Sequence, residues 1–162
     1  MMHFAEYASP VGNLLLGSDG QALTQLKFGG KPEGTPGNDA VLHFAKLWLD
    51  AYFRGEELPL EISLAPEGTP FQKQVWQCLL EIPWGQTRTY GEIAREMASR
   101  MGKQTMSAQA VGQAVGKNPI AILIPCHRVV GSGGKLTGYA WGLERKQWLL
   151  DHERRENGRN DQ

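Results

Sequence analysis

Two helix-start motifs constrain the fold of this chain more than any other feature of its sequence. Thr69-Pro70-Phe71-Gln72 and Thr89-Tyr90-Gly91-Glu92 are both capping boxes, in which a threonine and the residue three positions later bond each other's backbone amides. Proline at the first helical position strengthens the first motif, and Pro83-Trp84-Gly85 ends its helix. The sequence therefore predicts two short, separately capped helices, and Cys78 lies on the buried stripe of the first.

A third helix is predicted over residues 108–116. Ser107 can cap its start, and Asn118-Pro119 stops it. Small residues at alternate positions let its backbone approach another surface closely. Two explanations remain open, close packing in a core or contact with a nucleic-acid groove as part of a helix-turn-helix.

The first part of the chain predicts a small α/β domain with no catalytic motif. A hairpin joins strands 12–17 and 23–28, a helix covers 39–54, and an edge strand follows at 60–64. Residues 65–68 have the composition of a linker. We therefore predict two domains, residues 1–67 and residues 68–162.

The two parts of the chain differ in the sign of their net charge. Residues 1–67 carry nine acidic and four basic side chains, a balance of −5, whereas residues 68–135 carry three acidic and eight basic ones, a balance of +5. A positive middle segment is compatible with a polyanion such as nucleic acid, although a solvated helix face explains it equally well.

Composition excludes membrane and secreted classes. The hydrophobic fraction of 41% and the charged fraction of 21% are typical of a globular protein, and no apolar run has the length of a membrane span. The first residues lack the basic start and apolar core of a secretory signal. We expect a cytoplasmic protein with two free thiols, Cys78 and Cys126, and no membrane partner.

Ile124-Pro125-Cys126-His127-Arg128 is the candidate reactive segment. The apolar run 120–124 predicts a buried strand that ends at Cys126. Two neighbouring cations favour a reactive thiolate, but a free cysteine is also a common buried filler, so both roles remain open. Glycine-rich loops at 131–134 and 137–142 could bend around a flat ligand or form ordinary turns. A helix over 143–153 and a frayed tail over 154–162 complete the prediction.

An ordered set of motifs resembles the O6-alkylguanine-DNA alkyltransferases, over about residues 69–153 and more loosely near Ser9-Pro10-Val11-Gly12. The motifs are Phe71-Gln72 with Val75-Trp76, Ile82-Pro83-Trp84-Gly85, Thr89 to Ala94, Ala110-Val111-Gly112, Asn118-Pro119-Ile120, Ile124 to Val129, and Gly138-Tyr139 with Leu149 to Glu153. The resemblance implies an α+β fold, with a ribonuclease-H-like N-terminal domain and a winged-helix-like C-terminal domain.

The family's chemistry implies a role for four residues. Cys126 would accept the alkyl group, chiefly methyl, from O6 of guanine irreversibly, so each molecule acts once. His127 would deprotonate Cys126 through a water, and Glu153 would orient His127. Tyr90 would help rotate the nucleotide and donate to the departing base. Base flipping is required because O6 inside the stack cannot reach a buried thiol.

The resemblance also implies the remaining contacts, with duplex DNA as partner and no cofactor. We also expect a monomer and no metal, since residues 1–67 contain no cysteine for a Cys-rich metal site. Substrate-binding residues are expected at Asn118, Val129, Tyr139, Ala140 and Trp141. DNA-binding residues are expected at Thr89, Gln109, Ala110, Gly112 and Arg128.

Three positions depart from the family pattern. Gln109 stands where many members have an arginine that fills the vacated base stack. The turn over 99–106 is longer than in many members. Trp141 replaces a glycine found in some members and should narrow the pocket against bulky alkyl groups. Two alternatives are a non-catalytic alkylated-DNA-binding protein, whose known forms lack the acceptor cysteine, and a cysteine hydrolase, which the spacing does not favour.

Overall fold

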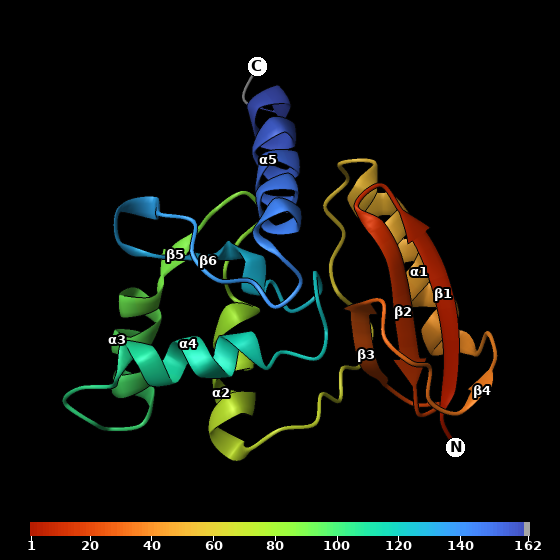
Figure 1. Ribbon diagram of the computed structural model, residues 1–162, viewed down its shortest axis with the longest axis horizontal. Helices are drawn as coiled ribbons and strands as arrows, with labels where there is room; N and C mark the ends of the chain where they lie inside the picture. Colours follow the sequence, from red (N-terminus) through yellow and green to blue (C-terminus); the bar gives the residue numbers. More distant parts are fainter. Residues whose placement is uncertain (161–162) are drawn as a thin grey trace. The chain divides into compact units, whose positions relative to one another are not determined.

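The computed structural model describes residues 1–160, with side chains as far as residue 155. Its contacts divide into two units, residues 1–67 with 119–123 and residues 68–118 with 124 onward (Figure 1). Each unit has its own buried core.

A four-stranded sheet with one helix forms the first unit. The sheet order is β3-β2-β1-β4, with β1 and β2 antiparallel, β2 and β3 antiparallel, and β4 parallel to β1. The helix α1 contacts β1, β2 and β3, and Asp39 caps its first turn. The predicted hairpin and helix are confirmed. The elements are β1 (His3–Ser9), β2 (Gly12–Ser18), β3 (Leu23–Phe28), β4 (Thr35–Pro36) and α1 (Ala40–Phe53).

Strand β1 is absent from the sequence prediction, whereas the predicted edge strand over 60–64 does not form. The segment makes only one isolated bridge, between Leu23 and Leu64. Leu23 donates to the Ser63 carbonyl at 2.8 Å, and Ala65 donates to the Leu23 carbonyl at 2.8 Å. Proline lies on both sides of this contact, at residues 59 and 66, and cannot donate to a longer ladder.

Helices dominate the second unit, as predicted. Both capping boxes are formed, at Thr69 and at Thr89, and the Ser107 side chain accepts from the Ala110 amide. Packing joins α2, α3 and α4 to one another, and Trp76 donates its ring N–H to the Ala114 carbonyl at 2.8 Å. The elements are α2 (Pro70–Leu79), β5 (Arg88–Thr89), α3 (Tyr90–Arg100), α4 (Ala108–Gly116), the 3₁₀ turn η1 (Cys126–Arg128), β6 (Val129–Val130), η2 (Ser132–Gly134) and α5 (Leu143–Asn160).

The predicted strand over 120–124 is wrong, although all five residues are buried. Leu123 donates to the Ala121 carbonyl at 2.7 Å, which closes a γ-turn around Ile122 at a φ of 69°. Cys126 donates to the Ile124 carbonyl at 2.7 Å, which closes an inverse γ-turn around Pro125 (φ −81°, ψ 64°). The chain therefore reaches Cys126 through tight turns and enters η1 directly.

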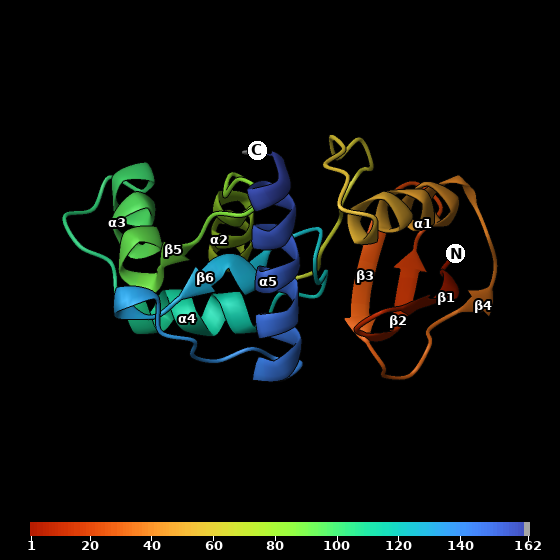
Figure 2. The ribbon, with the colours of Figure 1, turned by 90° about the horizontal axis from the view of Figure 1, so that it is seen from above.

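The prediction of a frayed tail is wrong over residues 154–160, because α5 continues to Asn160. Residues 161 and 162 lie outside the described part. The helix α5 lies beside the turn that leads into β6 (Figure 2). Within the described chain, none of the helices combines the length and the apolarity needed to cross a membrane.

Candidate active site

A small cavity of about 110 Å³ surrounds the Cys126 thiol. Helix α3 contributes Tyr90, and the loop after η2 contributes Tyr139. Cys126 itself is only 3% exposed. The remaining lining residues come from α4 and the glycine-rich loop: Gly112, Val115, Gly116, Gly138 and Ala140.

Burial raises the pKa of the Cys126 thiol to about 11, although Asn118, Lys146 and Tyr139 each act to lower it. The two neighbouring cations that the sequence analysis considered do not supply charge to the thiol. The charge of Arg128 is directed to Glu153, and His127 is held neutral by burial, which lowers its pKa. Cys126 is a protonated thiol at neutral pH, so its reaction needs a base.

Glu153 joins three segments of the second unit. Its carboxylate accepts from His127 Nε2 at 2.5 Å and from Arg128 Nε and Nη2 at 2.8 and 3.2 Å. It also accepts from the backbone amide of Gly85 at 3.2 Å. Burial alone raises the pKa of Glu153, but His127 and Arg128 outweigh that effect and lower the pKa. Glu153 is therefore an ionised carboxylate that holds η1 against α5.

The hydrogen bond to Glu153 determines which nitrogen of His127 can act as a base. An ionised carboxylate only accepts hydrogen bonds, so Nε2 carries the proton and donates a hydrogen bond to Glu153. The lone pair then resides on Nδ1, which is buried and has no hydrogen-bond partner among the described side chains and backbone. A neutral imidazole with a free lone pair can accept a proton.

Lys146 is a functional candidate that the sequence analysis misses. Its residue exposure is 0%, and its Nζ donates to the carbonyls of Thr137 and Gly138 at 2.8 and 2.9 Å. Burial lowers the pKa of Lys146 to about 8. A signal exists in the sequence, because Lys146 precedes Glu153 by two helical turns and shares the buried face with Leu149 and Leu150.

Tyr90 connects α3 with the glycine-rich loop. Its hydroxyl donates to the Thr137 carbonyl at 3.4 Å, and burial raises its pKa. Thr89 caps α3 with its side chain, which accepts from the Glu92 amide at 3.0 Å. A Cβ added at Gly112 would lie 3.7 Å from the Tyr90 ring, in ordinary van der Waals contact, so Gly112 packs close to this ring.

The predicted DNA-binding residues do not all lie on the surface. Gln109 is exposed on α4 and Ala110 is half-buried. Arg128, in contrast, is 8% exposed, and its Nη1 donates to the Ile82 carbonyl at 2.6 Å in addition to the Glu153 contacts. Its guanidinium is thus directed inward, and the structure does not place it where it could meet a phosphate.

Only two of the five predicted substrate-binding residues line the cavity around Cys126. Asn118 is buried and donates to the Ile124 carbonyl at 2.9 Å, and Val129 is buried where β6 begins. Tyr139 and Ala140 line the cavity. Trp141 packs edge-on against Tyr139, with ring centroids 5.3 Å apart, and is not among the residues that line the cavity.

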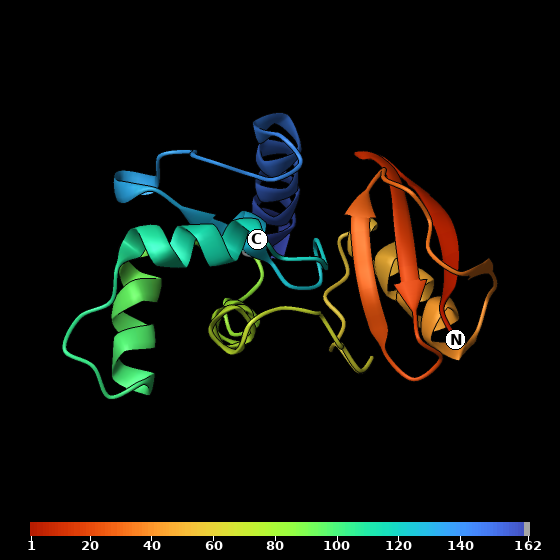
Figure 3. The ribbon, with the colours of Figure 1, turned by 60° about the horizontal axis from the view of Figure 1, so that its bottom comes forward.

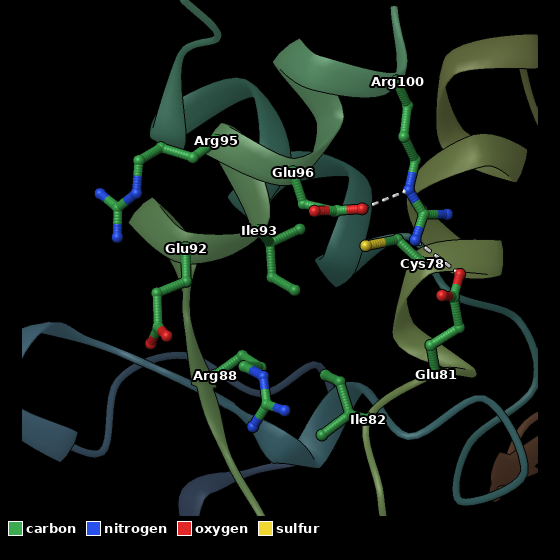
Figure 4. Close-up of a pocket in the computed structure, with 9 residues that line it drawn as sticks. All are labelled: Cys78, Glu81, Ile82, Arg88, Glu92, Ile93, Arg95, Glu96 and Arg100. Carbon is green, nitrogen blue, oxygen red and sulfur yellow. Dashed lines mark hydrogen bonds and ion pairs between the residues drawn. The ribbon is translucent and has the colours of Figure 1, made fainter.

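A larger hollow of about 530 Å³ lies elsewhere, between α2, β5 and α3 (Figure 4). It contains three arginines, three glutamates and Cys78, and it contains no predicted site residue. Within the described residues, no group of three His, Cys, Asp or Glu side chains is arranged to hold a metal ion.

Comparison with known proteins identifies both units. Residues 2–66 match the family model of the 6-O-methylguanine DNA methyltransferase ribonuclease-like domain, and residues 70–155 match that of its DNA-binding domain. A methylated-DNA–protein-cysteine methyltransferase of Methanosarcina acetivorans is 46% identical over 158 residues, covering 94% of this chain and 98% of the relative.

Solved structures give the same result. A crystal structure of Mycobacterium tuberculosis OGT in complex with DNA aligns with a TM-score of 0.85 and 43% identity, covering 95% of this chain and 94% of that chain. The O6-methylguanine methyltransferase of the same organism aligns with a TM-score of 0.82 and 42% identity, covering 96% and 94%. The fold class predicted from the sequence is confirmed, and the chain belongs to the 6-O-methylguanine DNA methyltransferase family.

Proposed function

We propose that this protein repairs O6-alkylguanine, chiefly O6-methylguanine, in double-stranded DNA by moving the alkyl group onto its own Cys126. The observation that carries the proposal is the Cys126 thiol, which lines a small cavity and is followed in the chain by His127, whose ring is bound to the buried Glu153. A thioether is stable, so each molecule is consumed by one transfer.

The target base has to leave the duplex to reach this thiol. Cys126 is buried, and a base inside the stack cannot approach it, so base flipping is required. Helix α4 supports this step, because its exposed Gln109 and its small residues Ala110 and Gly112 permit close contact with a groove. Thr89 lies at the start of α3, where backbone amides favour an anion.

Residues around the cavity position the flipped base. Backbone groups of Cys126, Val129 and Ala140 offer hydrogen bonds to its edge, and the Tyr139 ring forms one wall. Trp141 supports that wall through its contact with Tyr139. Asn118 connects the end of α4 to the Ile124 carbonyl and thereby holds the approach to Cys126.

Proton transfer activates the nucleophile. A water bound by His127 Nδ1 takes the proton of the Cys126 thiol and passes it to the imidazole, whose charge Glu153 then balances. The resulting thiolate attacks the methyl carbon, so that an S–C bond forms while the C–O6 bond breaks.

The departing guanine leaves as an anion and needs a proton. The Tyr90 hydroxyl, at the cavity wall, donates to the base as negative charge develops. The proton taken from Cys126 balances the proton that guanine receives. The products are unmodified guanine and S-methylcysteine.

Two further properties belong to the proposal. Both cysteines are free thiols, as a reducing compartment keeps them, and we place the protein in the cytoplasm. We also propose that it acts as a monomer with double-stranded DNA as its partner.

Intact mass after incubation with O6-methylguanine DNA tests the proposal. We expect the native protein and a Cys78→Ala control to gain one methyl group, and Cys126→Ala to gain none. An unchanged native mass together with tight binding would instead support a protein that only recognises alkylated DNA.

A further inference from the structure

A second hollow on α3 lies on the side that faces the turn before α4. The turn groove, as we call it, has a volume of about 570 Å³ between α3, residues 103–106 and the first residue of α4. Figure 3 shows the long turn extending away from α3 before the chain enters α4. Small residues of α3, Gly91, Ala94 and Ala98, form its floor.

Positively charged side chains distinguish the lining of the turn groove. Arg95 and Lys103 line it, and no acidic residue does. Neither side chain makes a hydrogen bond or an ion pair with the part of the chain whose side chains are described. Both cations are therefore available to an anion from outside.

The other arginine at the end of the same helix shows the contrast. Arg100 is bound by Glu81 at 2.6 Å and by Glu96 at 2.9 Å. Figure 4 shows this cluster and shows Arg95 directed away from it. The hollow between α2, β5 and α3, which Arg95 also lines, has three glutamates among its lining residues, whereas the turn groove has none.

Position links the turn groove to the proposed DNA surface. Gly91 at one end follows Tyr90, which lines the Cys126 cavity, and Ala108 at the other end precedes Gln109 on α4. A duplex that contacts Gln109 and approaches Tyr90 would therefore lie next to residues that line the groove. Exposed cations of this kind are suited to contact phosphates. Phosphate contacts fix the position of a protein on the duplex and do not read the base sequence.

We propose that the turn groove binds the DNA sugar–phosphate backbone next to the segment held by α4, with Arg95 and Lys103 each contacting a phosphate. This inference rests on the proposed function, because it assumes that the protein binds duplex DNA. Both side chains hold the duplex in position and take no part in the transfer to Cys126.

The dependence of DNA affinity on salt tests this inference. Binding to an undamaged duplex of about 20 base pairs is sufficient, because phosphate contacts do not depend on the lesion. For Arg95→Ala and Lys103→Ala we expect the slope of log Kd against log salt to fall by about 1 each, and by about 2 in the double variant. A rise from roughly 50 to 200 mM salt should then weaken native binding about 16-fold more than binding by the double variant.

Two matched variants complete the design. Lys73→Ala removes an exposed lysine of α2 that lines neither hollow, and it should leave the slope unchanged. Gln104→Lys adds a cation to the groove and should steepen the slope by about 1.

Methyl uptake at low salt separates this inference from the proposed function. If the native protein takes up no methyl group from O6-methylguanine DNA, the proposed function fails. If uptake occurs, and the slopes of the Arg95 and Lys103 variants equal the native slope or fall no further than the slope of Lys73→Ala, the turn groove does not bind phosphate. A changed oligomeric state in these variants without a changed slope would also refute the inference.

Discussion

Replacement of His127 by glutamine tests whether the buried base is needed. Burial raises the pKa of Cys126 to about 11, so at pH 7 only about one molecule in ten thousand carries a thiolate. Reaching that state from the thiol costs about 5.5 kcal/mol, at about 1.4 kcal/mol for each pH unit. In the proposed mechanism His127, which burial keeps neutral, accepts the proton.

His127→Gln removes the base and keeps a side-chain N–H that can donate to Glu153. We expect the rate of methyl transfer at pH 7 to fall by at least about a hundred-fold, with ten thousand-fold as the upper bound. The remaining rate should rise about tenfold for each pH unit toward the pKa of Cys126, because only the preformed thiolate reacts. The native rate should be flat above pH 7, since a base with a lowered pKa is already deprotonated.

Single-turnover transfer from O6-methylguanine DNA, measured from pH 6.5 to 9.5 at saturating protein, gives both quantities. Urea denaturation of the variant shows whether Arg128 and Glu153 still hold the fold. A folded variant that stays within tenfold of the native rate at pH 7, or whose pH profile is flat, would refute the role of His127 as base.

Three more predictions concern neighbouring residues. Burial lowers the pKa of Lys146 from 10.5 to about 8, so its charge costs stability below pH 8 and that cost disappears as the pH rises toward 10.5. The free energy of unfolding of the native protein, relative to Lys146→Met, should therefore rise over that range in urea denaturation, and a constant difference would contradict the burial argument. Gln109→Arg adds a cation to an exposed position of α4 and should steepen the salt dependence of duplex binding by about 1, whereas an unchanged slope would place residue 109 away from DNA. Trp141→Gly frees the Tyr139 ring and should raise the rate with O6-benzylguanine DNA relative to O6-methylguanine DNA, while equal native rates with both substrates would remove the basis for this prediction.

Local sequence patterns predicted the helices well. The capping boxes at Thr69 and Thr89 and the cap at Ser107 all form, because each depends on hydrogen bonds between residues three positions apart. Strands were less predictable. The segments 60–64 and 120–124 have apolar patterns typical of strands, but each pairs with β3 through a single isolated bridge.

The candidate site, like the fold, could be predicted from the sequence only in part. The motif around Cys126 and the family resemblance identified His127, Glu153 and Tyr90, and the structure brings His127 into contact with Glu153. No local pattern showed that Arg128 points inward, because its partner Glu153 lies 25 residues away on α5. Nor did the pattern identify Lys146, whose partners are backbone carbonyls of a loop.

The sequence by itself determined where the helices begin, the family of the chain and the candidate for the acceptor thiol, since these depend on neighbouring residues and on ordered motifs. Only the tertiary structure decided the protonation of that thiol. Burial removes Cys126 from water and raises its pKa, while Glu153 takes up the charge of Arg128 and fixes the proton on His127 Nε2. Solvation and charge pairing depend on residues far apart in the chain, and so the reactivity of Cys126 follows from the fold.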